Sequence, residues 1–134
     1  NVDDSDYLIY GVDEAMLREI YDYLDADAET FLRECKSEKS FFVQAHPYRS
    51  YCKPMDAALL DGVEVFNGNP RHNSQNQLAL MYATQHKLLQ CGGSDAHQTE
   101  DIGRGGLLTK ERITDLATLK RILREGSAEL IRNE

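Results

Sequence analysis

Short apolar runs alternate with helical patterns along this chain, and the alternation narrows the choice of fold. Each strand candidate is a brief apolar or β-branched run that ends near glycine, proline or asparagine. Such alternation is typical of parallel strands joined by helical crossovers, in an open sheet or a barrel. The sequence therefore predicts an α/β fold, with strands over 7–10, 41–45, 62–66, 88–91, 106–109 and 128–131, and helices over 13–24, 28–36, 74–87 and 114–125.

The helices carry their own start and stop signals. Asp13 is the expected N-cap of the first helix, and Gly126 is the expected residue that ends the last one. Apolar residues at helical spacing mark the faces that should be buried. On the helix over 74–87, the expected buried residues are Leu78, Leu80, Met81 and Ala83.

Candidate metal ligands stand just after three of the expected strands. In parallel α/β folds, functional sites lie at the carboxyl ends of the strands, so side chains there should meet at one rim. Imidazoles and carboxylates are suitable ligands for divalent metals. The alternative for the last pair is a tight turn with an exposed histidine. The rim residues are His46, Asn67 and the pair Asp95 and His97.

Size and composition limit the remaining possibilities. The 134 residues are enough for one domain over 1–134, and the net charge of −8 argues against binding long nucleic acids. Three scattered cysteines without a C-x-x-C spacing imply neither a zinc knuckle nor a disulfide framework, so we expect a cytoplasmic protein. No apolar run approaches the roughly 20 residues of a membrane span, and the acidic start does not have the pattern of a signal peptide.

Three motifs in this order resemble a known family. Ala45-His46-Pro47-Tyr48-Arg49, the stretch Gly62 to Pro70 (GVEVFNGNP) and Gly93-Ser94-Asp95-Ala96-His97 are similar to the later motifs of the PHP superfamily, the polymerase and histidinol phosphatase domain. The resemblance runs over nearly the whole chain. It implies a distorted, TIM-like (β/α)7 barrel, and it implies a metal-dependent phosphoesterase that binds divalent cations such as Mn, Zn or Fe.

The resemblance also assigns roles to particular residues. His46, Asp95 and His97 match the family's metal ligands, whereas Glu64 is expected to support the site rather than bind metal. Catalytic residues are not identified. Four further side chains on the same rim are candidates for a substrate phosphate, because guanidinium groups meet two phosphate oxygens at once; solvated surface groups are an equal alternative for each. They are Arg49, Arg71, His72 and Arg104.

The chain departs from the family pattern at its beginning. The family opens with His-x-His and further acidic ligands, and none of these occurs among the residues here; Leu8 stands about where related sequences often have histidine. A strand–helix unit takes roughly 30 residues, so this chain holds about half of a closed barrel. We therefore expect the C-terminal part of a PHP domain, a partial barrel that lacks its N-terminal strands. We expect it to bind metal sub-stoichiometrically and to be inactive alone.

Two other classes of function stay open. A non-catalytic PHP-like module could serve assembly, because open strand edges favour a homo-oligomer. A general metal- or nucleotide-binding α/β domain is disfavoured by the absence of G-x-G-x-x-G and P-loop motifs. For the phosphoesterase hypothesis, the expected partner is a small phosphorylated substrate or a short nucleotide.

Overall fold

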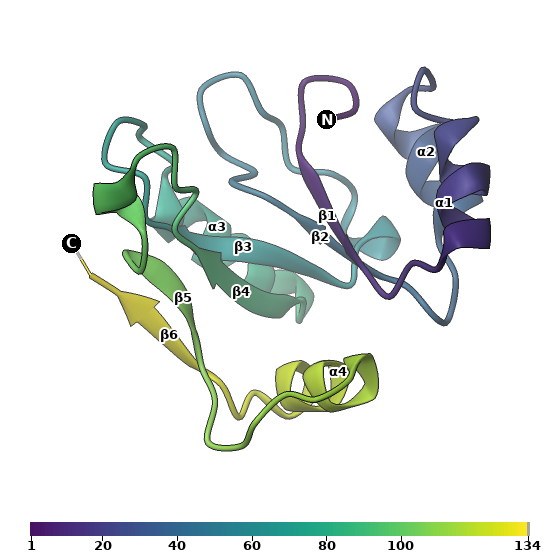
Figure 1. Ribbon diagram of the computed structural model, residues 1–134. Coiled ribbons are helices and arrows are strands. Elements are labelled where there is room, and N and C mark those ends of the chain that lie inside the picture. Colours follow the sequence, from purple (N-terminus) through teal and green to yellow (C-terminus); the bar gives the residue numbers. More distant parts are fainter. Residues whose placement is uncertain (134) are drawn as a thin grey trace.

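The computed structural model describes residues 1–133 and has the mixed α/β architecture that the sequence predicts (Figure 1). Two short 3₁₀ helices, η1 and η2, accompany four α-helices and six strands. In chain order the elements are β1 (Tyr7–Tyr10), α1 (Glu14–Tyr21), α2 (Ala28–Cys35), β2 (Phe41–Gln44), η1 (Ala57–Leu59), β3 (Gly62–Asn67), α3 (Asn76–His86), β4 (Leu89–Gly93), η2 (Thr99–Asp101), β5 (Gly105–Leu108), α4 (Leu116–Glu125) and β6 (Glu129–Arg132).

The strands form two sheets. The larger has the order β1-β2-β3-β4, with β2, β3 and β4 parallel, and the smaller pairs β5 with β6. The prediction of parallel strands is therefore correct for the centre and wrong elsewhere: β1 runs antiparallel to β2, and β5 runs antiparallel to β6. Alternation of strands and helices does not fix strand direction, because the connection between two strands can return the chain either way. The three parallel strands end at one rim (Figure 1).

The first two helices begin at aspartate caps. The side chain of Asp13 accepts a hydrogen bond from the N–H of Met16, and Asp27 does the same for Thr30. Helix α1 ends at Tyr21, three residues before the predicted end, because the chain tightens into a 3₁₀-type turn there. On α1, Ile20 is buried and Leu17 is exposed.

The predicted buried face of helix α3 is correct only in part, for Ala83 and the half-buried Leu80. Ala79 and Ala83, one turn apart, are buried, whereas Leu78 and Met81 are exposed. The two small side chains bring the helix close to the sheet, and α3 packs mainly against β3. A helix with apolar residues all round gives no clear face in the sequence, so size rather than hydropathy decides which side packs.

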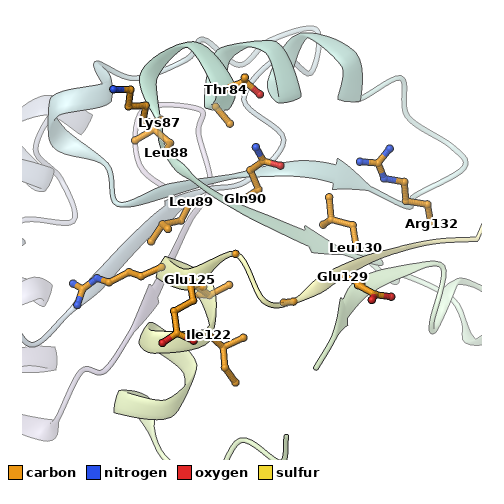
Figure 2. Close-up of a pocket in the computed structure, with 15 residues that line it drawn as sticks. Thr84, Lys87, Leu88, Leu89, Gln90, Ile122, Glu125, Glu129, Leu130 and Arg132 are labelled. Atoms are coloured by element: carbon orange, nitrogen blue, oxygen red, sulfur yellow. The ribbon is translucent and has the colours of Figure 1, made fainter. Parts of the chain in front are cut away.

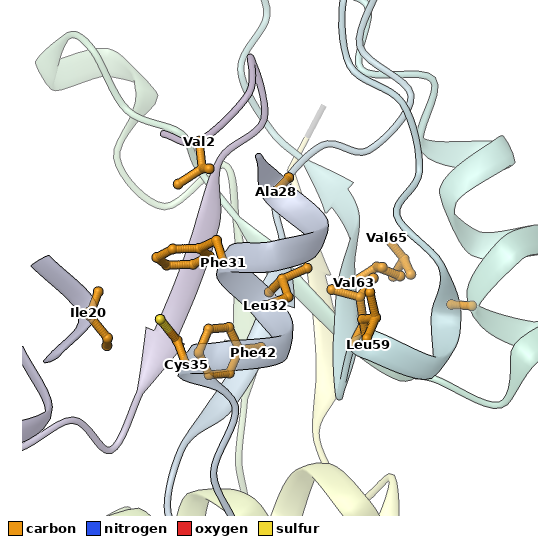
Figure 3. Close-up of a cluster of buried hydrophobic side chains, with 12 residues drawn as sticks. Val2, Ile20, Ala28, Phe31, Leu32, Cys35, Phe42, Leu59, Val63 and Val65 are labelled. Atoms are coloured by element: carbon orange, nitrogen blue, oxygen red, sulfur yellow. The ribbon is translucent and has the colours of Figure 1, made fainter. Parts of the chain in front are cut away.

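The main core lies between helix α2 and the sheet (Figure 3). Phe31 and Phe42 meet edge to face with their ring centroids 6.3 Å apart, and both are fully buried beside Leu32. A smaller apolar cluster on the other side of the sheet joins Phe41 and Val43 to Leu123 of α4. Burial on both faces explains why strand β2 is apolar along most of its length.

A β-bulge in β3 changes the direction in which the side chain of Asn67 points. The register against β4 shifts between Glu64 and Phe66, which pairs Glu64 with Cys91 and Phe66 with Gly92. In a regular strand, residues three apart point to opposite faces. The bulge turns the strand end so that Asn67 lies on the same side as Glu64, and their side chains hydrogen-bond at 3.0 Å.

A cavity of about 720 Å³ lies where the first half of β4 diverges from β6 and α4 (Figure 2). Leu89, Ile122 and Leu130 form part of its wall, with Lys87 and Glu125 nearby. It lies at the amino end of β4, away from the rim, and none of the predicted site residues lines it.

Within residues 1–133, no helix has the length and apolarity needed to span a membrane.

Candidate functional site at the carboxyl ends of the parallel strands

The rim at the ends of β2, β3 and β4 is held in unusual backbone conformations. His46 and Asp95 both have positive φ angles, 30° and 46°, although neither is glycine. Such conformations are unfavourable for residues with a Cβ and persist where surrounding contacts fix them. Both residues stand directly after the strands, where the sequence predicted ligands. Two of the six non-glycine residues with positive φ among residues 1–133 therefore lie at the candidate site.

Asp95 is the centre of a polar cluster on this rim. Its Oδ2 accepts a hydrogen bond of 2.6 Å from the Arg49 Nη2 and lies 3.4 Å from the Asn69 Nδ2. Its Oδ1 lies 3.7 Å from the His97 Nδ1. Burial acts to raise the pKa of Asp95, but the hydrogen bond and charge of Arg49 outweigh it, so the pKa is lowered. Asp95 is therefore a carboxylate at neutral pH.

Glu64 is a buried residue of β3 that connects the ends of β2 and β3 through hydrogen bonds. Its buried Oε2 accepts hydrogen bonds from the His46 N–H at 2.9 Å and from the Asn67 Nδ2 at 3.0 Å. The Asn67 Oδ1 in turn accepts a hydrogen bond from Arg49. Burial raises the pKa of Glu64 to about 7, although these hydrogen bonds oppose the rise. Glu64 thus supports the rim without facing solvent, as the sequence analysis expected.

His46 is buried and turned toward the N-terminal segment. Its Nε2 lies 3.3 Å from an Asp6 carboxylate oxygen, and its Nδ1 lies 3.7 Å from the Cys52 sulfur. Burial lowers the pKa of His46, and the nearby charge of Arg49 lowers it further. The imidazole is therefore neutral at physiological pH, which is the form that binds metals.

The loop that carries Asp95 and His97 is fastened by a second ion pair. Arg71 meets both carboxylate oxygens of the buried Asp101, and Nη1 and Oδ1 are 3.0 Å apart. Asp101 also accepts the backbone N–H groups of His97 and Gln98 at 2.9 Å. Hydrogen bonding from Arg71 keeps the pKa of Asp101 well below its usual range. Arg71 is thus engaged in fixing the loop, although from the sequence it was a candidate for either a substrate phosphate or a solvated surface group.

His72 and Arg104 border a separate polar cavity of about 300 Å³ beside the rim. Asn67 and Asn69 form its inner wall, so the cavity is adjacent to the Asp95 cluster. The Nε atom of Arg104 is buried and has no hydrogen-bond partner among residues 1–133. This buried atom does not face the cavity, but a cationic side chain at the edge of a polar cavity is suited to an anion.

The described residues do not fit a divalent metal as they are placed. The chemistry of His46, Asp95 and His97 is suitable. However, within residues 1–133 no group of three or more histidine, cysteine, aspartate and glutamate side chains is arranged to hold a metal ion. One oxygen of Asp95 is taken by Arg49, and the Nε2 of His46 faces Asp6. The three predicted ligands therefore do not converge on one point in this arrangement.

Several residues of the rim were not predicted from the sequence. Asn69 looked like a turn former, because asparagine beside proline and glycine usually is, and Ser74 looked like the start of a helix. Asp101 stands in a polar stretch without any periodic signal, and Asp6 belongs to the acidic start of the chain. The only available clue was position, since Asn69 follows a strand end closely. Their roles depend on contacts between distant segments.

Two comparisons with known proteins gave matches. Residues 73–128 match the model of a family described as PHP-associated. The chain is also similar to the crystal structure of a "putative metal-dependent phosphoesterase" from Bifidobacterium adolescentis, with 32% sequence identity and a TM-score of 0.42. That match covers 72% of this chain and 36% of the other, so this chain spans about a third of that protein's length. No curated protein matches the sequence.

Proposed function

Because this chain carries a C-terminal, PHP-associated portion of the PHP superfamily, as its motifs indicated, we propose that it forms part of a metal-dependent phosphoesterase. The reaction would be the hydrolysis of a phosphate ester. The observation that carries the proposal is the rim itself: three parallel strands bring His46, Asn67 and Asp95 to one edge, beside a polar cavity that Arg104 borders.

The proposed substrate site is the cavity bordered by His72 and Arg104. Arg104 would bind non-reacting phosphate oxygens through its guanidinium group. The walls formed by Asn67 and Asn69 would hold the phosphate next to Asp95 and His97. Arg49 and Arg71 are less suited to a direct contact, since each already donates to a carboxylate. A small phosphorylated molecule or a short nucleotide fits the size of this cavity.

The proposal extends to the parts that this chain does not supply. A divalent metal, Mn, Zn or Fe, would be the cofactor of the whole protein, with His46, Asp95 and His97 among several ligands. The whole domain would then be a distorted barrel of which this chain is a part. By itself the chain is expected to bind metal poorly and to show no phosphatase turnover.

The test is the binding of inorganic phosphate to the purified chain, measured by isothermal titration calorimetry. We expect Arg104→Met to weaken phosphate binding by about tenfold, because one charged hydrogen-bonding group is worth about 1.5–3 kcal/mol. Arg112→Met, which removes an exposed arginine outside this cavity, is the matched control and should bind as the wild type does. Equal phosphate binding by the wild type and Arg104→Met would count against the substrate site and favour a non-catalytic module.

A second measurement concerns activity. Hydrolysis of p-nitrophenyl phosphate in the presence of Mn²⁺ should be indistinguishable from the uncatalysed rate for this chain alone. Substantial turnover that is lost in His97→Ala would show that the chain is active without further ligands.

A further inference from the structure

We propose that the cavity of about 720 Å³ beside the first half of β4 binds an extended peptide segment of a partner protein, which adds to the sheet as a further strand. The segment would carry apolar residues at alternate positions and acidic residues at its ends. The cavity lies away from the rim, so this inference is independent of the proposed function. It starts from a strand edge that is unpaired beside an apolar wall.

The free edge of β4 follows from the direction of its backbone groups. The N–H of Leu89 donates to the Asp61 carbonyl at 3.1 Å, on the side of β3. Successive residues of a strand turn their backbone groups to opposite sides, so the N–H and C=O of Gln90 face away from β3. Among residues 1–133, the four-stranded sheet has no strand beyond β4, and Gln90 lines the cavity. The cavity wall thus includes a backbone donor and acceptor of the kind that pair with another strand.

The cavity is closed at one end and open along the rest of this edge. A Cβ added at Gly92, near the end of β4, would lie 3.0 Å from the Leu130 Cδ2 and 3.2 Å from the Gly106 carbonyl oxygen. The second half of β4 is therefore covered by β5 and β6. Toward its amino end β4 diverges from them, which leaves the space beside Gln90 (Figure 2).

Apolar side chains line the same space. Leu89 of β4, Ile122 of α4 and Leu130 of β6 form part of the wall (Figure 2). Ile122 is buried, whereas Leu89 and Leu130 are half-buried and can gain contacts. In an extended peptide, alternate side chains point to one face, so two apolar residues separated by one position would cover this wall. Backbone pairing for affinity and alternate side chains for specificity are the features of strand addition.

The charges around the cavity favour acidic ends on the segment. Its charged lining residues are Lys87, Arg124, Arg132, Glu125 and Glu129. Glu125 is already paired with Arg121 at 2.9 Å, whereas the three cations have no ion-pair partner among residues 1–133. The border of the cavity is therefore cationic in balance, although the whole chain has a net charge of −8.

The probe is the peptide acetyl-Asp-Val-Thr-Val-Asp-amide, titrated into the isotope-labelled chain and followed by NMR. At saturation we expect hydrogen exchange of the Gln90 amide to slow by at least tenfold, because its N–H then donates to the peptide. Replacing both aspartates of the peptide by lysine should weaken binding severalfold, since like charges then meet at the border.

N-methylated peptides test whether the contact is a strand pairing. A methyl group on nitrogen removes one backbone donor. Methylating the central threonine and methylating the two valines remove donors from opposite edges of the extended peptide. One of these two changes should weaken binding about tenfold and the other much less.

Gln90→Pro and Gln90→Ala are the matched variants. Proline removes the N–H that faces the cavity and is tolerated on the outer side of an edge strand, whereas alanine keeps this N–H. We expect Gln90→Ala to bind the peptide as the wild type does and Gln90→Pro to bind it about tenfold more weakly. If Gln90→Pro does not fold by circular dichroism, the N-methylated peptides on the wild type decide.

The inference is overturned by absence of binding at millimolar peptide, by binding that leaves exchange at Gln90 unchanged, or by equal weakening from the two methylations. A folded Gln90→Pro that binds as well as Gln90→Ala also overturns it. Slow exchange at Gln90 that increases with protein concentration, with no peptide present, would assign the space to a second copy of this chain instead. Because phosphate binding at Arg104 is measured separately, each of these results leaves the proposed function standing.

Discussion

Glu64 shows how one buried carboxyl group can connect the fold with the chemistry of the rim. It lies under three strand ends and accepts hydrogen bonds from His46 and Asn67. Its pKa of about 7 lies well above the ordinary value of 4.5, chiefly because burial disfavours the charge. Between these two values the folded chain keeps a proton that the unfolded chain releases. Stability is therefore expected to fall as the pH rises through this interval.

Glu64→Gln should remove this dependence on pH. Glutamine resembles the protonated acid and can still accept both hydrogen bonds through its Oε1. The interval from 4.5 to about 7, at 1.36 kcal/mol per pKa unit, corresponds to on the order of 3 kcal/mol. We therefore expect the free energy of unfolding of Glu64→Gln to lack a fall of about 2–3 kcal/mol between pH 4.5 and pH 8 that Glu64 contributes to the wild type. The lowered pKa of His46 acts in the opposite direction in both proteins.

Urea denaturation at a series of pH values, with a chelator present, measures the effect. The matched control is Glu38→Gln, which removes an exposed carboxyl group and should keep the slope of the wild type. A slope in Glu64→Gln equal to that of the wild type would show that another group titrates in this interval.

Among the elements, the contact of β4 with β5 controls how the Asp95 loop is held. Ser94 lies at the end of β4, and its hydroxyl donates to the Gly105 carbonyl at 2.9 Å and accepts the N–H of the same residue at 3.2 Å. Gly105 itself lies against the backbone of Gly93. A Cβ at position 105 would come within 2.7 Å of the Gly93 carbonyl carbon, where no room exists.

Gly105→Ala should therefore separate β5 from β4. We expect a loss of about 1–3 kcal/mol in the free energy of unfolding, the usual range for a side chain forced into a packed contact. Gly106→Ala is the neighbouring control, because its Cβ would meet the Ile131 Cδ1 at an ordinary 3.7 Å. Thermal or urea unfolding of both variants measures the difference. If Gly105→Ala and Gly106→Ala are equally stable, separating β5 from β4 does not lower the free energy of unfolding, and the prediction is wrong.

The strands and their ends could be predicted from the sequence because the signals are local. Short apolar runs closed by glycine, proline or asparagine gave all six strands, and the Asp13 cap gave the start of the first helix. The sequence could not predict the relative direction of the strands or which distant residues form pairs. Nothing local distinguishes the antiparallel β1 from the parallel β2, and the pairing of Arg49 with Asp95 joins residues 46 positions apart.

The candidate site was predicted in part for the same reason. The positions of His46, Asp95 and His97 just after strands are where the structure has them, whereas the three side chains do not converge on one point in this arrangement. Asp101 was missed, because a buried acid is recognisable only once its arginine partner is known. Side-chain size on α3 could not be weighed from the sequence either. Ala83 and Met81 are both apolar and both were expected to be buried, but only the smaller Ala83 is.

For the whole molecule, the open edges of the larger sheet matter most. Strand β1 has one neighbour in this sheet, so its other edge presents unpaired backbone groups. Leu8 on β1 is 40% exposed, and an exposed apolar residue on an edge strand favours pairing with another chain. The same edge is where further strands of a larger domain could add. We therefore propose that the isolated chain forms dimers through β1.

Leu8→Lys tests this proposal, because a charge on an edge strand opposes pairing between chains. In sedimentation velocity runs over a range of concentrations, we expect the wild type to show a dimer that grows with concentration and Leu8→Lys to stay monomeric. Leu17→Lys on helix α1 introduces the same charge at another exposed leucine, away from any strand edge, and should dimerise as the wild type does. A wild type that stays monomeric at the highest concentration contradicts edge pairing. Dimers lost equally in both variants would point to general charge repulsion, since the two leucines share hydropathy and differ in the element that carries them.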